Sequence, residues 1–297
     1  FNLIKFFLQV LQRKVIIWHY NSIKKTHNKS LFPYLKYNDT ITDAWYIFKD
    51  YEKNVNNFID NYTKKGYKDF FLDIGANIGL TTISNWKKFD NLYCFEPNSL
   101  VFNILKTNIA ISCDTEKVKL FNVGLGLNRG KYMLKIPKHN FGGAFIKENN
   151  EYTRTTLLEK ERFHSEKDDN YIETQVNIES KDFLNENIFN KFKAEHKGII
   201  KIDVEGYEMQ VLELILNTIN ANKIVIIFEN WQTIDRKVIE RMIKKNNFVS
   251  FKMGYIKWLS SFMEKIKLQS IYSDIIFLDH NQQYLPKKCD IVLELEK

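Results

Sequence analysis

The sequence is poor in cysteine and has no motif that pairs cysteines. Its three cysteines, Cys94, Cys113 and Cys289, are odd in number, and none belongs to a C-x-x-C motif. A disulfide framework and a cysteine-based zinc site are therefore not expected. The default compartment for such cysteine usage is the reducing cytoplasm.

Long uninterrupted hydrophobic runs are also missing. The most apolar terminal stretch, residues 1–18, is broken by Lys5, Arg13 and Lys14, whereas a membrane-spanning helix needs about 20 mostly apolar residues. Its apolar spacing predicts an amphipathic helix that docks on its own domain, on a partner protein, or peripherally on a membrane. Because the first residue is not Met, we expect the sequence to begin inside a longer product.

The sequence lacks the usual signs of nucleic-acid binding. The formal net charge is +8, but the basic residues are scattered, and no zinc finger, RNP-like motif or long Lys/Arg block is present. Nucleic acid is therefore not expected as a partner. The composition, 44% hydrophobic and 27% charged, is ordinary for a globular enzyme.

One segment stands out from this background. A short apolar strand is expected over residues 70–74, and it runs into two glycines four positions apart, Gly75 and Gly79, after an acid, Asp73. Glycines there let backbone N–H groups approach a ligand beside a helix N-terminus. The pattern D-x-G-x-x-x-G is typical of an S-adenosylmethionine site, where Asp73 would suit the methionine ammonium or the sulfonium. A dehydrogenase loop or an ordinary strand-helix turn remains an alternative. The candidate cofactor-binding residues of this loop are Asp73, Gly75, Ala76, Asn77, Gly79 and Thr81.

A second strand is expected to end about twenty residues later at Glu96. An acid at this position of a nucleoside-binding fold accepts the ribose hydroxyls, although Glu96 could also be a solvated strand-end carboxylate. Pro97 favours a turn, and Asn98 is a candidate N-cap. At the end of the third strand, Asn122, Val123 and Gly124 are where the adenine would lie.

Further carboxylates follow two later strands. Asp203 and Glu205 end a buried strand, and Glu229 ends the fifth one. In open α/β sheets, ligands bind beyond the carboxyl ends of the strands, so these three acids are the catalytic candidates. Asp203 is also a cofactor-binding candidate, and Lys201 is either its structural partner or a catalytic group.

Two of these segments resemble the signatures of the FkbM family of S-adenosylmethionine-dependent methyltransferases. The signature F-x-D-x-G-A-N-x-G is present at residues 71–79, and K-x-D-x-E-G-x-E at residues 201–208. The resemblance covers residues 70–228, with a weaker echo at 274–278. The chain departs from the T-L-D-like stretch of the family at residues 178–182, so substrate contacts are not transferred from there.

The resemblance implies S-adenosylmethionine as the cofactor and a class I methyltransferase fold. It also implies O-methyl transfer to a hydroxyl-bearing acceptor, a sugar in a surface glycan or its precursor. One alternative is a non-catalytic scaffold that partners a glycosyltransferase. A second, less favoured alternative is a nucleic-acid methyltransferase. The acids would take the proton of the hydroxyl or would hold a divalent metal that lowers its pKa; the sequence does not separate these mechanisms.

The alternation of strands and helices predicts an α/β fold with a doubly wound, mostly parallel seven-stranded sheet of the Rossmann-like type. We expect an N-terminal helical extension over residues 1–62 and a methyltransferase domain over residues 63–297. Residues 125–185 are too long for a simple connection. They are expected to form a substrate-covering insertion, with a hairpin around residues 132–136 and a strand near residues 175–178.

Overall fold

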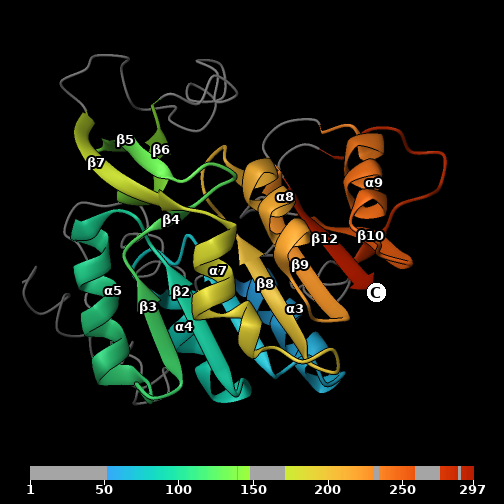
Figure 1. Cartoon of the computed structure of the whole chain (residues 1–297), viewed down its shortest axis with the longest axis horizontal. Coiled ribbons are helices and arrows are strands. Elements are labelled where there is room, and N and C mark those ends of the chain that lie inside the picture. The colour runs from blue at the N-terminus through green and yellow to red at the C-terminus, as the bar shows by residue number, and fades with distance from the viewer. Residues whose placement is uncertain (1–51, 139, 148–170, 231–233, 258–274, 287–288) are drawn as a thin grey trace, which may run out of the picture.

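A large twisted sheet forms the centre of the molecule (Figure 1). The computed structural model describes residues 52–138, 140–147, 171–230, 234–257, 275–286 and 289–297. Within them, the sheet has the strand order β11-β10-β12-β9-β8-β1-β2-β3. Its strands are β1 (Phe70–Ile74), β2 (Asn91–Phe95), β3 (Val118–Phe121), β8 (Lys197–Ile202), β9 (Lys223–Asn230), β10 (Ser250–Lys257), β11 (Ile276–Phe277) and β12 (Cys289–Glu296).

The predicted fold class is confirmed, but the strand count was one too low. Five neighbouring strands, β3, β2, β1, β8 and β9, are parallel to one another. The sheet becomes mixed at β12, which runs antiparallel to both β9 and β10. The eighth strand is the two-residue edge strand β11, which pairs with β10 through Tyr255 and Gly254. A two-residue strand is too short to show alternation, but β11 lies within residues 274–278, where the resemblance to the family indicated a late strand.

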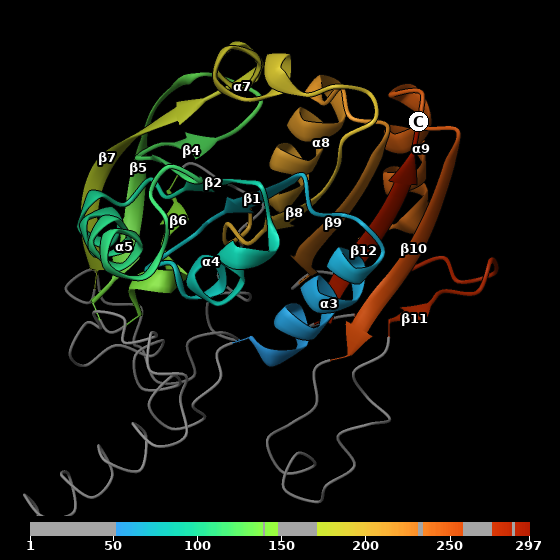
Figure 2. The ribbon, with the colours of Figure 1, turned by 90° about the horizontal axis from the view of Figure 1, so that it is seen from below.

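Helices cover both faces of this sheet, as the parallel strands require. Figure 2 shows α3, α4 and α5 on one face and α7, α8 and α9 on the other. Each face has its own buried apolar cluster, one containing Phe71 and Ile199, the other Phe70 and Ile200. Neighbouring residues of one strand therefore point to opposite cores. The helices are α3 (Lys53–Lys64), α4 (Leu80–Asn85), α5 (Ser99–Ser112), α7 (Lys181–Asn187), α8 (Glu208–Thr218) and α9 (Arg236–Lys245), with short 3₁₀ turns η1 (Trp86–Lys88), η2 (Phe141–Gly143) and η4 (Phe189–Lys191).

A second, four-stranded sheet lies at one end of the large one (Figure 1). It consists of β4 (Gly124–Leu125), β5 (Gly130–Pro137), β6 (Phe145–Ile146) and β7 (Tyr171–Glu179) in the order β4-β7-β5-β6. β5 pairs with β7 antiparallel along its whole length and with β6 through Leu134 and Lys135. Strands therefore do form around residues 132–136 and 175–178. A substrate-covering role for residues 125–185 stays a prediction.

The expected helix upstream of the first strand is present in part as α3. Its buried side chains, which include Phe58, Ile59 and Tyr62, pack into the same cluster as Phe71 of β1. Residues 1–51, which include the predicted amphipathic stretch 1–18, lie outside the described residues, and the division of the chain at residue 62 stays a prediction. In the part of the chain that the structure describes, no helix is both long enough and apolar enough to cross a membrane.

Candidate active site

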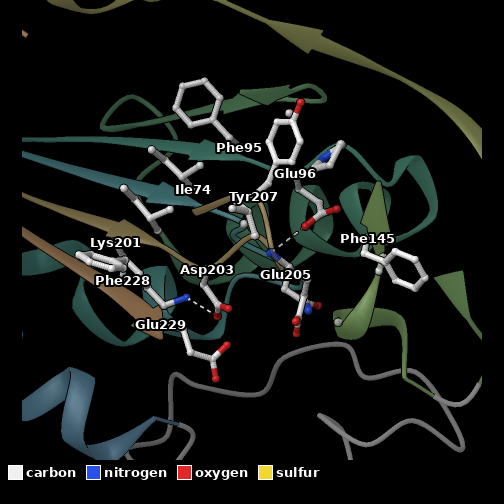
Figure 3. A pocket seen from close by; sticks show the side chains of 18 of the residues that line it. Ile74, Phe95, Glu96, Phe145, Lys201, Asp203, Glu205, Tyr207, Phe228 and Glu229 are labelled. Carbon is white, nitrogen blue, oxygen red and sulfur yellow. Dashed lines mark hydrogen bonds and ion pairs between the residues drawn. The ribbon is translucent and has the colours of Figure 1, made fainter. Parts of the chain in front are cut away.

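A pocket of about 470 Å³ opens at the carboxyl edge of the large sheet. This volume is in the usual range of small-ligand sites. One wall is made by residues at the ends of parallel strands, Gly75, Glu96, Asp203 and Glu229. The other wall comes from the second sheet and η2 and is largely apolar. It includes Leu134, Phe141, Phe145, Ile146 and Ile178. In Figure 3, Glu229 and Phe145 lie at opposite ends of the view, with Asp203 and Glu205 between them.

The glycine loop after β1 forms the floor of the pocket. Gly75 has a φ of 84°, and a Cβ added there would lie 1.8 Å from the backbone carbonyl oxygen of Asp203. The N–H groups of Gly75 and Ala76 both donate to the carbonyl of Phe95 (3.0 and 2.9 Å). Bare backbone is thus held against the ends of β2 and β8. The helix α4 begins directly after Gly79, as the sequence predicted.

Glu96 is clamped at the end of β2 by the two loops beside it. Its Oε2 accepts a hydrogen bond from the N–H of Asn77 (3.1 Å), and its Oε1 accepts one from the N–H of Asn98 (2.8 Å). Burial raises the pKa of this carboxyl to about 7, against the lowering effect of those two N–H groups and with smaller raising effects from Asp73 and Asp203. Each carboxylate oxygen has a second lone pair, so the group can still accept two ribose hydroxyls.

Asn98 and Asn122 support the turn that carries Glu96. The Asn98 side chain caps α5 by accepting from the N–H of Leu100 (3.1 Å), which confirms the predicted N-cap. The Asn122 amide donates to the carbonyls of Glu96 and Pro97 (2.8 and 3.2 Å). Both side chains thus fix the backbone around Glu96.

Asp73 lies below the pocket. Its side chain is fully buried, and its Oδ2 accepts from the Thr82 hydroxyl (2.7 Å). Its Oδ1 is 3.9 Å from the Lys201 ammonium, which also lies 2.9 Å from Asp203 and 3.6 Å from Glu52. Burial raises the pKa of Asp73, and the charge of Lys201 opposes that effect. The carboxylate of Asp73 does not line the pocket. Its expected contact with the cofactor stays a prediction.

Three carboxylates converge at the mouth of the pocket. Asp203, Glu205 and Glu229 each place an oxygen so that the three oxygens lie within 4.8 Å of one another, and all three side chains are half-buried. Glu205 reaches this place from an unusual backbone conformation, with a φ of 46°, directly before Gly206 at 84°. Figure 3 shows the Lys201 ammonium directed at Asp203. Carboxylate oxygens so close together suit a proton acceptor or a divalent cation.

The pocket brings together only part of the predicted set. The predicted residues that line it are Gly75, Asn77, Glu96, Pro97, Gly124, Asp203, Glu205 and Glu229. Those that do not line it are Asp73, Ala76, Gly79, Thr81, Asn98, Asn122 and Val123.

Two pocket acids were missed from the sequence, Glu52 and Asp290. Asp290 lies on β12 directly opposite Glu229 of β9, and only the strand register could have placed it there. Glu52 stands more than twenty positions before the glycine loop, in no recognisable motif. No local signal in the sequence marks either of them.

Comparison with known sequences identifies the family. The family model of the Methyltransferase FkbM domain matches residues 73–253, more than half of the chain. The chain belongs to the FkbM methyltransferase family. It is also 23% identical over 176 residues to the methyltransferase sdnD of Sordaria araneosa. That match covers 56% of this chain and 65% of the relative, so the chain spans less than two thirds of the relative's length.

The similarity to solved structures is low both in sequence and in structure. A putative O-methyltransferase from Klebsiella pneumoniae is 11% identical with a TM-score of 0.42, and the match covers 91% of this chain and 94% of that one. The O-methyltransferase TomG from Streptomyces achromogenes, solved in complex with S-adenosylmethionine, is 8% identical with a TM-score of 0.41, and the match covers 90% and 93%.

Proposed function

We propose that this protein is an S-adenosylmethionine-dependent O-methyltransferase whose acceptor is a hydroxyl of a sugar, in a surface glycan or its precursor. The observation that carries the proposal is the position of the three carboxylates Asp203, Glu205 and Glu229. They open onto the same pocket as the glycine loop and Glu96. Groups that can take a proton thus border the same pocket as the residues that we assign to the cofactor. The choice of a sugar as the acceptor rests on the likeness to the family.

The chemistry of the donors fits the cofactor. Glu96 suits a ribose, because both of its oxygens are fixed and still have lone pairs. The bare backbone at Gly75 suits close approach of a ligand. When bound, the cofactor supplies a methyl group activated by a sulfonium. The chain has to orient the acceptor hydroxyl and take its proton, and this second task falls to the carboxylates at the mouth.

The same oxygens are the ligands that Mg²⁺ prefers. We propose direct proton transfer to a carboxylate, and a metal is tested as the alternative use of Asp203, Glu205 and Glu229. Turnover that persists in EDTA supports the direct route. Turnover that is lost in EDTA and restored by Mg²⁺ would assign the acids to a metal.

The test of the function itself is binding followed by turnover. Titration calorimetry should show binding of both S-adenosylmethionine and S-adenosylhomocysteine, and radiolabelled methyl should then pass to members of a panel of oligosaccharides. If neither nucleoside binds, the result would favour the alternative of a non-catalytic scaffold that partners a glycosyltransferase. Transfer to RNA or DNA oligonucleotides, with affinity that falls steeply as salt rises, would instead favour the nucleic-acid alternative.

Neutralising the acids at the mouth should lower turnover more than cofactor affinity. For Glu205→Gln and Glu229→Gln we expect turnover to fall roughly 100-fold, the usual contribution of a proton acceptor. The affinity for S-adenosylhomocysteine should stay within about threefold, because the glycine loop and Glu96 are unchanged. Glu240→Gln on α9, outside the pocket, is the control. Full turnover in both pocket variants would remove these two acids from the mechanism.

Cofactor affinity should depend on pH through Glu96. The carboxyl must be ionised to accept two ribose hydroxyls, and its pKa is raised to about 7 by burial in the cofactor-free protein. Protonation therefore competes with binding, and the dissociation constant of S-adenosylhomocysteine should be about tenfold higher at pH 6 than at pH 8. Calorimetry at both pH values in matched buffers measures this dissociation constant.

Glu96→Gln is the control for that titration. The amide keeps the size of the side chain but does not titrate, so this variant should bind more weakly at pH 8, and its affinity should change less between pH 6 and pH 8 than that of the wild-type protein. An affinity of the wild-type protein that is equal at pH 6 and pH 8 would contradict the assignment of Glu96 to the ribose.

A further inference from the structure

The charged side chains among the described residues that line the pocket are mostly acidic, although the chain as a whole is basic. The formal net charge is +8, yet carboxylates outnumber lysines among these pocket residues. The carboxylates are Glu52, Glu96, Asp203, Glu205, Glu229 and Asp290, and the lysines are Lys53 and Lys201. Such a pocket favours cationic groups. S-adenosylmethionine carries two of them, an ammonium and a sulfonium.

Glu52 and Asp290 are the two pocket carboxylates without a role in the proposed mechanism, and Glu52 is the one that contacts the helix after the glycine loop. It lies directly before α3, in a left-handed backbone conformation with a φ of 53°. Its side chain is only 9% exposed and borders the same pocket as Gly75 and Asn77 of the glycine loop. The hydroxyl of Thr81, in the first turn of α4, donates to its Oε2 (2.6 Å). Glu52 is therefore tied to the helix that follows the glycine loop.

The surroundings of Glu52 would favour an additional cation. Burial raises its pKa, and the nearby carboxylates Asp203 and Asp73 raise it further, against the lowering effects of Lys201 and of the Thr81 hydroxyl. The Lys201 ammonium lies closer to Asp203 (2.9 Å) than to Glu52 (3.6 Å). A cationic group in the pocket beside Glu52 would stabilise the ionised form.

We infer that Glu52, rather than Asp73, binds the ammonium of the methionine half of the cofactor. Asp73 does not border the pocket and is bound to Thr82, whereas Glu52 does border it, next to the glycine loop. Asp73 then has an indirect role, because it helps to hold Lys201 in position beneath the pocket. This inference rests on the proposed function, since it concerns the same cofactor.

The test compares two nucleosides that differ in the methionine half. S-adenosylhomocysteine has the ammonium, and 5′-methylthioadenosine lacks the whole amino-acid group. For Glu52→Gln we expect the affinity for S-adenosylhomocysteine to fall roughly 10- to 100-fold, the range for loss of a charged hydrogen bond. The affinity for 5′-methylthioadenosine should stay within about twofold. The glutamine oxygen can still accept from Thr81, so the loop keeps its anchor.

Two further variants keep the outcome interpretable. Glu240→Gln removes a carboxylate that pairs with Arg236 outside the pocket and should change neither affinity. Glu52→Asp keeps the charge on a shorter side chain and should give an intermediate loss for S-adenosylhomocysteine alone. It replaces Glu52→Gln as the readout if thermal melting shows the latter to be unfolded.

The results separate the inference from the proposed function. Equal losses for both nucleosides in the Glu52 variants, or no loss for S-adenosylhomocysteine, would overturn the role of Glu52 while leaving the cofactor assignment intact. Failure of the wild-type protein to bind either nucleoside would instead overturn the proposed function and this inference with it.

Discussion

Gly75→Ala should lower the free energy of unfolding by about 3 kcal/mol or more and abolish cofactor binding. Two costs combine. The new Cβ would lie 1.8 Å from the carbonyl oxygen of Asp203, and the backbone at this position has a φ of 84°. The atom in the way is backbone of the strand end, which cannot rotate aside as a side chain would. β1 and β8 would have to separate at the point where the pocket is built.

Gly66→Ala is the matched control. Gly66 has a φ of 90°, but an added Cβ there would meet no heavy atom within 4 Å. Only the cost of the left-handed conformation remains, about 1–2 kcal/mol. Urea unfolding of both variants gives the comparison, and calorimetry with S-adenosylhomocysteine gives the binding result. Equal destabilisation of the two would mean that close contact with β8 is not what requires glycine at position 75.

Lys201→Met should lower the free energy of unfolding by about 3–5 kcal/mol at pH 8, the range for removing one partner of a buried ion pair. The Lys201 side chain is 7% exposed and lies within 4 Å of three carboxylates, those of Glu52, Asp73 and Asp203. Removing its charge would leave the buried carboxylates of Glu52 and Asp73 without that cation. Methionine preserves most of the apolar stem, so packing is largely retained.

The destabilisation in Lys201→Met should shrink as the pH falls. The folded-state pKa values of Glu52 and Asp73 are already raised by burial, and Lys201 lowers both, so losing it raises them further. A group with a raised folded pKa contributes stability below its unfolded pKa and loses that contribution as the pH rises through the folded value. The variant should therefore be closest to the wild-type protein near pH 4–5.

Lys147→Met is the control for the buried charge. Lys147 pairs with Glu173 in an exposed ion pair (3.0 Å), and exposed pairs contribute little. Urea unfolding at pH 5 and pH 8 measures both variants. A destabilisation of Lys201→Met that does not change between these pH values would point to lost packing rather than to charge.

The parallel half of the fold followed from sequence because each strand is a short apolar run ending in a polar turn. β1 was predicted at its observed limits, and the helix that begins after Asn98 carries the predicted cap. The carboxyl ends of such strands share one edge of the sheet, so the pocket positions of Gly75, Glu96 and Asp203 could also be predicted. A position can be predicted wherever one strand and its own turn determine it.

Other features depend on contacts between distant segments, which one sequence does not reveal. Whether the carboxylate of Asp73 faces the pocket or the interior depends on Thr82 and Lys201, which hold it below the loop. Asp290 reaches the pocket only through the register of β12 on β9. The strand β11 is two residues long and pairs at an edge, so it has no periodicity to detect, and only the resemblance of residues 274–278 to the family pointed to it.

The pocket walls come from widely separated parts of the sequence, from Glu52 before the first strand to Asp290 in β12. A growing chain therefore lacks a complete pocket until β12 has been synthesised and inserted between β9 and β10. A nucleoside that binds the complete pocket can therefore bind only late in folding, after β12 has been inserted. Its binding energy is added to the native state alone.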